Sequence, residues 1–164
     1  MHIPAAEPVL APRQERAFTQ TIHATPDRVF PLLCPVMEAR WLNDWTYRMI
    51  HSESGVAEPG AVFETPHADG RTLWIITAHE PDTRVAFARW QPDDLVVSLD
   101  IRLAPHGTAK TRVDIRYVWT GIGPLARSAL DALTVEAWRD NMLHWERSMN
   151  AWLANAASRT TATC

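Results

Sequence analysis

The clearest structural signal lies in two segments, LVVSLDIRL at residues 95–103 and TRVDIRYVW at residues 111–119. In both segments apolar side chains alternate with polar ones. Successive side chains of a β-strand point to opposite faces, so each segment is expected to have one apolar and one polar face. The pattern is typical of antiparallel strands in a sheet that buries one face and exposes the other.

Weaker alternation continues toward the N-terminus. We predict four further strands, separated by Gly, Pro and Asp turn residues, at residues 47–52, 61–65, 72–79 and 85–90. A first strand is predicted over residues 16–24.

Two short helices are expected after this first strand. Thr25-Pro26-Asp27 has the residues of a helix start, with Thr as N-cap and Pro at the first helical position. The first helix must stop before Pro35, and a second is predicted over residues 36–41.

Nothing breaks a helix from Pro124 to about Ala154, so one helix of roughly 30 residues and about 45 Å is predicted there. Its apolar stripe consists of Leu130, Leu133, Trp138, Met142, Trp145, Met149 and Trp152. A single stripe cannot fill the inside of a curved sheet of about seven strands, so a cavity between helix and sheet is expected. The predicted fold class is α+β.

Composition limits the classes of function. The chain has 164 residues, 16 basic and 19 acidic side chains and a formal net charge of −3, with Lys110 as the only lysine. We therefore expect no nucleic-acid partner, because phosphate contact needs a clustered cationic face. No apolar stretch approaches the ~20 residues of a membrane span, and the N-terminus lacks the pattern of a secretory signal. A cytoplasmic location is the default expectation.

Metal and disulfide chemistry are not indicated. Cys34 and Cys164 cannot form a disulfide framework, and no Cys or His pair has metal-site spacing. We expect neither a metal nor a cofactor. One domain is predicted over residues 15–154, with residues 1–14 and 155–164 as flexible termini.

Several motifs in this order resemble a known superfamily. They are ATPDRVF at residues 24–30, LCPVME at residues 33–38 followed by Trp41 and Trp45, Ser54-Gly55, PGAVF at residues 59–63, and Trp138 with Trp145-Glu146. Together they resemble the START-like or SRPBCC superfamily, which shares the helix-grip fold of Bet v 1-type proteins, and within it the bacterial polyketide cyclase/dehydrase and lipid transport group. The resemblance covers about residues 16–154. It implies a cavity for an apolar or aromatic small molecule, without a universal catalytic residue.

The predicted ligand-binding residues come from three places. The short helices supply Trp41, Trp45 and Tyr47, although the two tryptophans favour a second interpretation as anchors that seat these helices on the sheet. The long helix supplies Trp138, Asn141, Met142 and Trp145, and the inner strand faces supply Phe63, Phe87, Leu99, Ile101, Tyr117 and Trp119. The faces occupied by Trp74 and Trp90 are left open.

No catalytic set is recognisable. His144, Arg89 and Glu38 are the candidates for acid–base work, and for each histidine a structural or surface position is favoured. Arg89 lies between Phe87 and Gln91 on a strand, and its default orientation is outward, because a buried charge is rare without a partner or a ligand.

The segment from Gly121 to Ala126 nearly matches a dinucleotide-binding fingerprint. That fingerprint needs a βαβ unit, and no strand follows here, so we reject it. The leading hypothesis is a carrier or sensor that binds a lipid-, isoprenoid- or polyketide-like molecule. The alternatives are a polyketide cyclase/dehydratase-type enzyme that uses the same cavity, and a chaperone-activator-like interaction module with a filled cavity. A homodimer is left open.

Overall fold

The computed structural model describes residues 10–67, 70–91 and 95–161, with side chains described up to residue 156. The helices of this part of the chain are α1 (Pro26–Val29), the 3₁₀ helix η1 (Phe30–Leu33), α2 (Pro35–Trp41), α3 (Ala126–Asp131) and α4 (Val135–Thr161). The strands are β1 (Arg13–Ile22), β2 (Arg48–His51), β3 (Val62–His67), β4 (Gly70–Glu80), β5 (Arg84–Gln91), β6 (Leu95–Pro105) and β7 (Thr111–Gly121).

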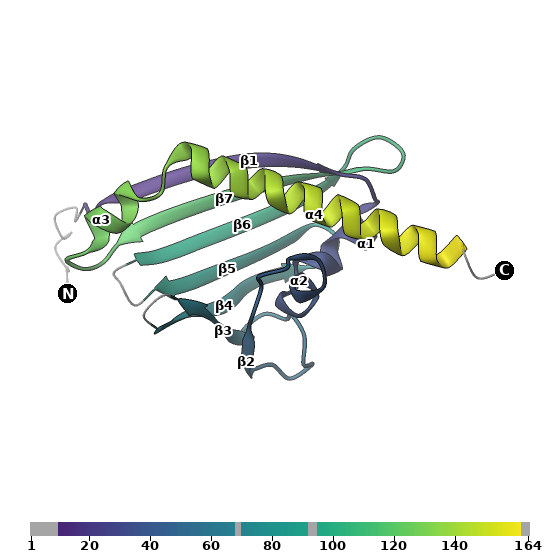
Figure 1. Cartoon of the computed structure of the whole chain (residues 1–164). Helices are drawn as coiled ribbons and strands as arrows, with labels where there is room; N and C mark the ends of the chain where they lie inside the picture. Colours follow the sequence, from purple (N-terminus) through teal and green to yellow (C-terminus); the bar gives the residue numbers. More distant parts are fainter. Residues whose placement is uncertain (1–9, 68–69, 92–94, 162–164) are drawn as a thin grey trace, which may run out of the picture.

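All seven strands form one antiparallel sheet in the order β1-β7-β6-β5-β4-β3-β2. The sheet curves, and α4 runs along its concave side close to β1, while α2 lies over the part of the sheet formed by β3 and β4 (Figure 1). The predicted α+β class, the seven strands and the two short helices after the first strand are confirmed.

The start of β1 and the end of the last helix lie beyond the predicted limits. β1 begins at Arg13 and ends at Ile22, whereas residues 16–24 were predicted, and Arg13 pairs with Thr120. The Gly121 amide also donates to the carbonyl oxygen of Pro12 at 2.8 Å, so the pairing with β7 holds this early segment. At the other end α4 continues to Thr161, because residues 155–161 contain no helix breaker.

The prediction of one unbroken helix from Pro124 is wrong. The helix is interrupted between Asp131 and Val135, and the Thr134 hydroxyl accepts a hydrogen bond from the Ala137 amide at 3.2 Å, which makes Thr134 the N-cap of α4. Side chains of β1 satisfy carbonyl oxygens at the interruption: Gln14 Nε2 donates to Leu130 and Arg16 Nη2 to Leu133, both at 3.1 Å. These partners lie more than 110 residues away in sequence, so local pattern could not reveal the break.

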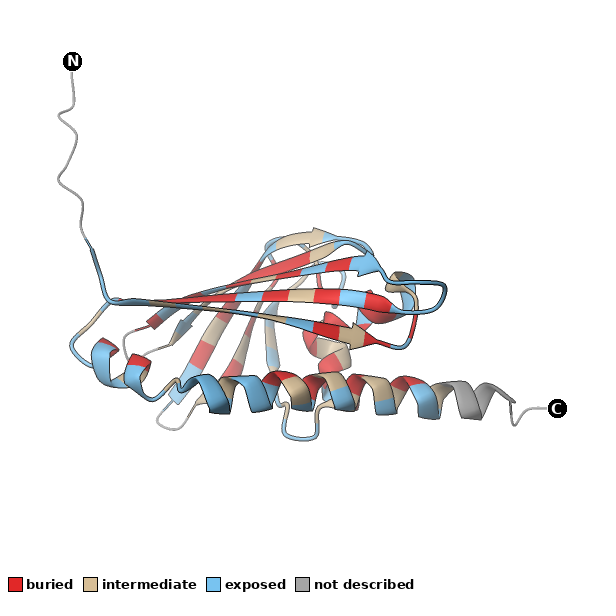
Figure 2. Ribbon diagram, turned by 90° about the horizontal axis from the view of Figure 1, so that it is seen from above, coloured by how far each residue is buried: buried red, intermediate tan, exposed pale blue. Residues whose placement is uncertain are grey.

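The two sheet faces differ in chemistry. Buried and exposed residues alternate along the strands, and α4 turns its buried side toward the sheet (Figure 2). The convex face carries a series of ion pairs, among them Arg84–Asp100 at 2.6 Å and Arg116–Glu15 at 2.6 Å. Trp90 lies on this outer face, 48% exposed, which settles one of the two tryptophan positions left open by the sequence.

The core fills the space between the sheet and the helices. Ile22, Leu33, Ile101, Ile115 and Met149 are all at most 2% exposed. Gln20, also fully buried, donates from Nε2 to the Met142 carbonyl oxygen at 2.7 Å and thereby ties β1 to α4. No helix in the described part of the chain is long and apolar enough to cross a membrane.

Candidate functional site

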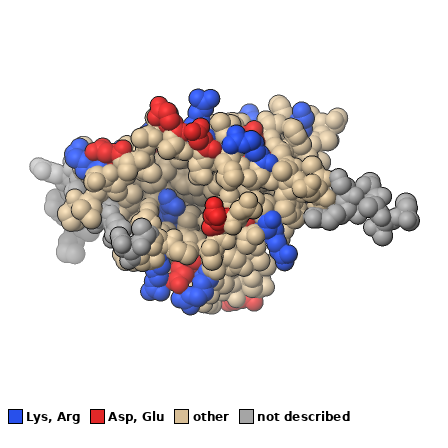
Figure 3. Space-filling view, viewed as in Figure 1, with Lys and Arg blue, Asp and Glu red and all other residues tan. Residues whose placement is uncertain are grey.

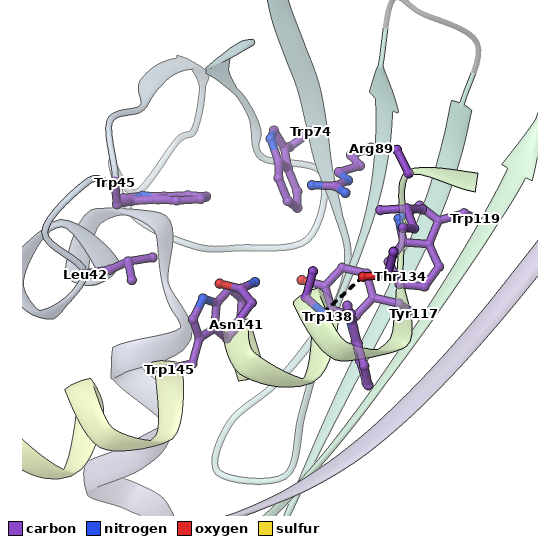
Figure 4. A pocket seen from close by; sticks show the side chains of 13 residues that line it. Leu42, Trp45, Trp74, Arg89, Tyr117, Trp119, Thr134, Trp138, Asn141 and Trp145 are labelled. Atoms are coloured by element: carbon purple, nitrogen blue, oxygen red, sulfur yellow. Dashed lines mark hydrogen bonds between the residues drawn. The ribbon is translucent and has the colours of Figure 1, made fainter. Parts of the chain in front are cut away.

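A pocket of about 400 Å³ opens between the sheet, the segment after α2 and the first turns of α4. It is lined by Leu42, Trp45, Trp74, Arg89, Tyr117, Trp119, Ala132, Leu133, Thr134, Ala137, Trp138, Asn141 and Trp145. Figure 4 shows these side chains converging from β4, β5, β7, α4 and the segment after α2. The face shown in Figure 3 is hollowed near its centre, and most of the atoms around the hollow belong to uncharged residues.

The segment after α2 holds its part of the wall through indole hydrogen bonds. Trp45 Nε1 donates to the Pro35 carbonyl oxygen at 2.9 Å, and Trp41 Nε1 donates to that of Leu32 at 2.9 Å. The Trp41 ring then packs edge-on against Trp145 of α4, with 6.0 Å between centroids. Both tryptophans are therefore anchors, and Trp45 also lines the pocket.

Stacked aromatic rings make the strand side of the wall rigid. Trp74 on β4 stacks on Phe63 of β3 at 5.5 Å, and its Nε1 donates to Thr65 Oγ1 at 3.0 Å. On β7, Tyr117 stacks on Trp119 at 5.0 Å. These rings are held by cross-strand neighbours and hydrogen bonds, so the wall is largely preformed.

Arg89 points into this aromatic wall. It pairs in register with Trp74 and Val97, both buried on the concave face. Its guanidinium carbon lies 4.9 Å from the centroid of the Trp74 ring and 6.0 Å from that of Tyr117 (Figure 4). The default expectation of an outward Arg89 is wrong, because its position on β5 has the same parity as the buried Val85 and Phe87.

The charge of Arg89 has no acidic partner among the described residues. Its Nε is fully buried without a hydrogen bond, whereas the residue as a whole is only partly buried because it borders the open pocket. Burial lowers the pKa of the guanidinium from its usual value, and Tyr117 opposes that shift. Because guanidinium is a very strong base, the side chain remains a cation at neutral pH.

Two further titratable groups are buried near the pocket. Glu38 on α2 is 6% exposed and makes no side-chain hydrogen bond within the described chain, and burial raises its pKa to about 8. Glu38 precedes the wall residue Leu42 by four positions, so both lie on one face of this turn. Burial, above all, raises the pKa of Tyr117 to about 12, and the nearby Glu38 adds to the shift. Both groups are mainly neutral at pH 7.

Six of the predicted ligand-binding residues meet in the wall: Trp45, Tyr117, Trp119, Trp138, Asn141 and Trp145. Trp41, Phe63, Phe87, Leu99, Ile101 and Met142 are buried in the core and do not line the pocket. Tyr47 lies at a separate shallow depression beside Arg48 and Glu64. Of the catalytic candidates, Arg89 lines the pocket, Glu38 is buried on α2 outside the pocket lining, and His144 is exposed on α4.

The sequence did not predict that Trp74, Leu42, Ala137 and residues 132–134 at the helix interruption would line the pocket. Trp74 belongs to the run Leu73-Trp74-Ile75-Ile76, which is apolar on both faces, so alternation carries no signal there. Thr134 was recognisable only as one more helix residue. Within the described residues no group of three or more His, Cys, Asp or Glu could hold a metal ion.

Comparison with known proteins shows the fold. No protein-family model matches the sequence, and no curated protein is significantly similar to it in sequence. Among solved structures, Ara h 8.0201, of the Bet v 1 family, has a TM-score of 0.64 at 12% identity, over 87% of this chain and 99% of its own. A norcoclaurine synthase from Thalictrum flavum in complex with dopamine and hydroxybenzaldehyde has a TM-score of 0.63 at 9% identity, over 94% and 96%. A hypothetical protein from Helicobacter pylori has a TM-score of 0.66 at 12% identity, over 92% and 99%.

These proteins share the sheet and the long C-terminal helix with the present chain, at identities that speak for the fold alone. The chain has a Bet v 1-like helix-grip fold.

Proposed function

We propose that this protein binds a small hydrophobic, aromatic molecule in the pocket between the sheet and α4, as a carrier or sensor. The observation that carries the proposal is the wall itself: five of the eight tryptophans of the chain and one tyrosine surround about 400 Å³ of open space. Binding pockets for small molecules typically have this size and an apolar lining with few polar groups. Aromatic rings held edge-on and stacked present flat surfaces that suit another ring.

Two of the structural neighbours support the proposal by analogy. The norcoclaurine synthase of Thalictrum flavum was solved with dopamine and hydroxybenzaldehyde, which are both one-ring aromatic molecules, and also with a transition-state analogue. The pocket volume suits a molecule of one to three rings, and the flat aromatic wall favours rings over a long acyl chain. We therefore favour an aromatic or compact polyketide-like ligand over a membrane lipid.

The expected affinity for a neutral ligand is modest. Removing roughly 250 Å² of apolar ligand surface from water contributes about 6 kcal/mol before the cost of immobilising the ligand is subtracted. The gross figure alone corresponds to a dissociation constant of about 40 μM, and the immobilisation cost weakens it to the millimolar range or beyond.

The test is titration with a neutral aromatic probe, 2-naphthamide, followed by calorimetry and by tryptophan fluorescence. Trp138 lines the pocket and Trp90 lies exposed on the opposite sheet face, so the two form a matched pair. We expect Trp138→Ala to weaken binding about five- to tenfold, because it removes one side of the wall, and Trp90→Ala to leave it unchanged. Equal effects of the two substitutions, or no binding by the unmodified protein, would refute the proposal.

A second function is favoured by one observation, the buried Glu38. A carboxyl group whose pKa lies near 8 is protonated at neutral pH and could serve as a general acid toward a bound substrate, as in a cyclase or dehydratase. Glu38→Gln should then abolish turnover of a substrate found by screening and retain its binding. Retained turnover would eliminate this assignment. The open pocket does not favour the interaction-module alternative, which requires a filled cavity.

A further inference from the structure

The unpaired polar atoms of the pocket wall are all donors. Five buried side-chain nitrogen or oxygen atoms of the described residues lack a hydrogen-bond partner, and three of them belong to the wall: Arg89 Nε, Trp119 Nε1 and Trp138 Nε1. An unpaired buried polar group costs stability, so a set of three in one wall calls for an explanation. A ligand that accepts hydrogen bonds would supply one.

The guanidinium of Arg89 is placed to meet such a ligand. Nε is sealed in the wall, but the two terminal nitrogens are not fully buried and donate no hydrogen bond to the described chain. The rings of Trp74 and Tyr117 contact the guanidinium and hold its plane against the wall. The fork of terminal donors is thereby available to a group inside the pocket.

The surroundings leave the cation uncompensated. Tyr117, which lines the pocket, and Glu38, which interacts with it electrostatically, are mainly neutral at pH 7. The first turn of α4 also borders the pocket through Thr134 and Ala137, and the N-terminal end of a long helix carries a partial positive charge. Among the described residues that line the pocket, Arg89 is thus the one charged side chain, and the rest of the wall is mostly aromatic or aliphatic.

We propose that the ligand of this pocket is an aromatic carboxylate, whose carboxylate is bound by the terminal nitrogens of Arg89 and whose ring lies among the wall tryptophans. A planar carboxylate matches the planar fork of arginine with two parallel hydrogen bonds. A single guanidinium fits a singly charged group better than a phosphate monoester, which carries up to two charges and in proteins is usually met by several donors. The inference rests on the proposed function, since it names the ligand class of the same site.

The test compares two probes of nearly equal shape, 2-naphthoate and 2-naphthamide, on the full chain. We expect the unmodified protein to bind 2-naphthoate at least about tenfold more tightly than 2-naphthamide, because charge-assisted hydrogen bonds are roughly twice as strong as neutral ones. Arg89→Met should remove this preference, so that the variant binds the two probes with affinities within about threefold of each other. Arg84→Met is the matched control, since Arg84 is paired with Asp100 on the convex face and should retain the preference.

The outcomes separate this inference from the proposed function. If both probes bind with equal affinity, or if Arg89→Met retains the preference, the carboxylate inference is wrong and the aromatic pocket stands. If neither probe binds, both proposals fall. Arg89→Lys provides a second variant if Arg89→Met does not fold. It keeps the charge without the fork and should show an intermediate preference, and a full preference would refute the two-bond geometry.

Discussion

Replacing Arg89 by methionine should stabilise the ligand-free protein. The buried Nε and the absence of an acidic partner among the described residues mean that the folded state holds a partly desolvated cation. Burying an ion costs several kcal/mol, and a desolvated cation–π contact returns about 2 kcal/mol or more. The Trp74 contact at 4.9 Å supplies most of this cation–π energy, because Tyr117 at 6.0 Å lies at the distance limit for such contacts.

The net penalty is about 1–3 kcal/mol, so we expect Arg89→Met to raise the free energy of unfolding by that amount. For a domain of this size each kcal/mol shifts the melting temperature by about 2–4 °C, which predicts a rise of about 2–12 °C. Guanidinium unfolding followed by circular dichroism measures the first quantity, and a thermal scan measures the second.

The control is again Arg84→Met. Arg84 Nη2 lies 2.6 Å from Asp100, and this partnership raises the pKa of Arg84, so its loss should bring no gain in stability. A decrease in stability for Arg89→Met, or equal changes in both variants, would show that Arg89 serves the fold and would remove the reason to assign it a ligand.

The remaining predictions concern the acid behind the pocket, the cap of α4 and the packing of α3. Burial raises the pKa of Glu38 from 4.5 to about 8, so the contribution of this group to stability should be greatest below pH 4.5 and should fall as the pH rises toward 8. The loss is at most about 5 kcal/mol, at 1.36 kcal/mol per pKa unit. Glu38→Gln should flatten this part of the stability profile in denaturant titrations. Thr134→Ala should cost about 1 kcal/mol by removing the N-cap, and Thr134→Ser should restore most of it; equal losses would contradict the capping role. Gly121→Ala should cost about 1–3 kcal/mol, because a Cβ there would lie 2.5 Å from that of Ala126, whereas Gly70→Ala meets nothing within 4 Å and should be close to neutral in the same assay.

The last two strands were the most predictable parts of the molecule. Burial alternates along most of β6 and the first half of β7 because one face is buried and the other carries paired charges. Local pattern also located Pro26 at the start of α1, since a proline at the first helical turn leaves no hydrogen bond unmade. The second short helix was predicted from residue 36, and α2 begins one residue earlier, at Pro35.

The existence of the pocket was predictable, because one helix cannot fill a curved sheet, but its lining residues were predictable only in part. The covering helix and the short helices supplied Trp45, Trp138 and Trp145 to the expected cavity. The middle strands contributed the rest of the wall, and there the pattern is weak. Trp74 stands in a run that is apolar on both faces, and β5 turns Arg89 inward and Trp90 outward, the reverse of what hydrophobicity predicts.

Alternation and helix punctuation in the sequence are thus sufficient for the order of elements, the antiparallel sheet and the existence of a hollow beneath one long helix. The inward cation, the cap at Thr134 and the partners of the wall tryptophans depend on contacts between residues far apart in the chain. The physical reason is that a shift of one residue in strand register, or a break in a helix, moves a side chain into entirely different surroundings and costs little free energy in the local backbone. The register of β4, β5 and β6 and the carbonyl partners supplied by β1 therefore place Arg89 in the pocket and end α3 where it ends.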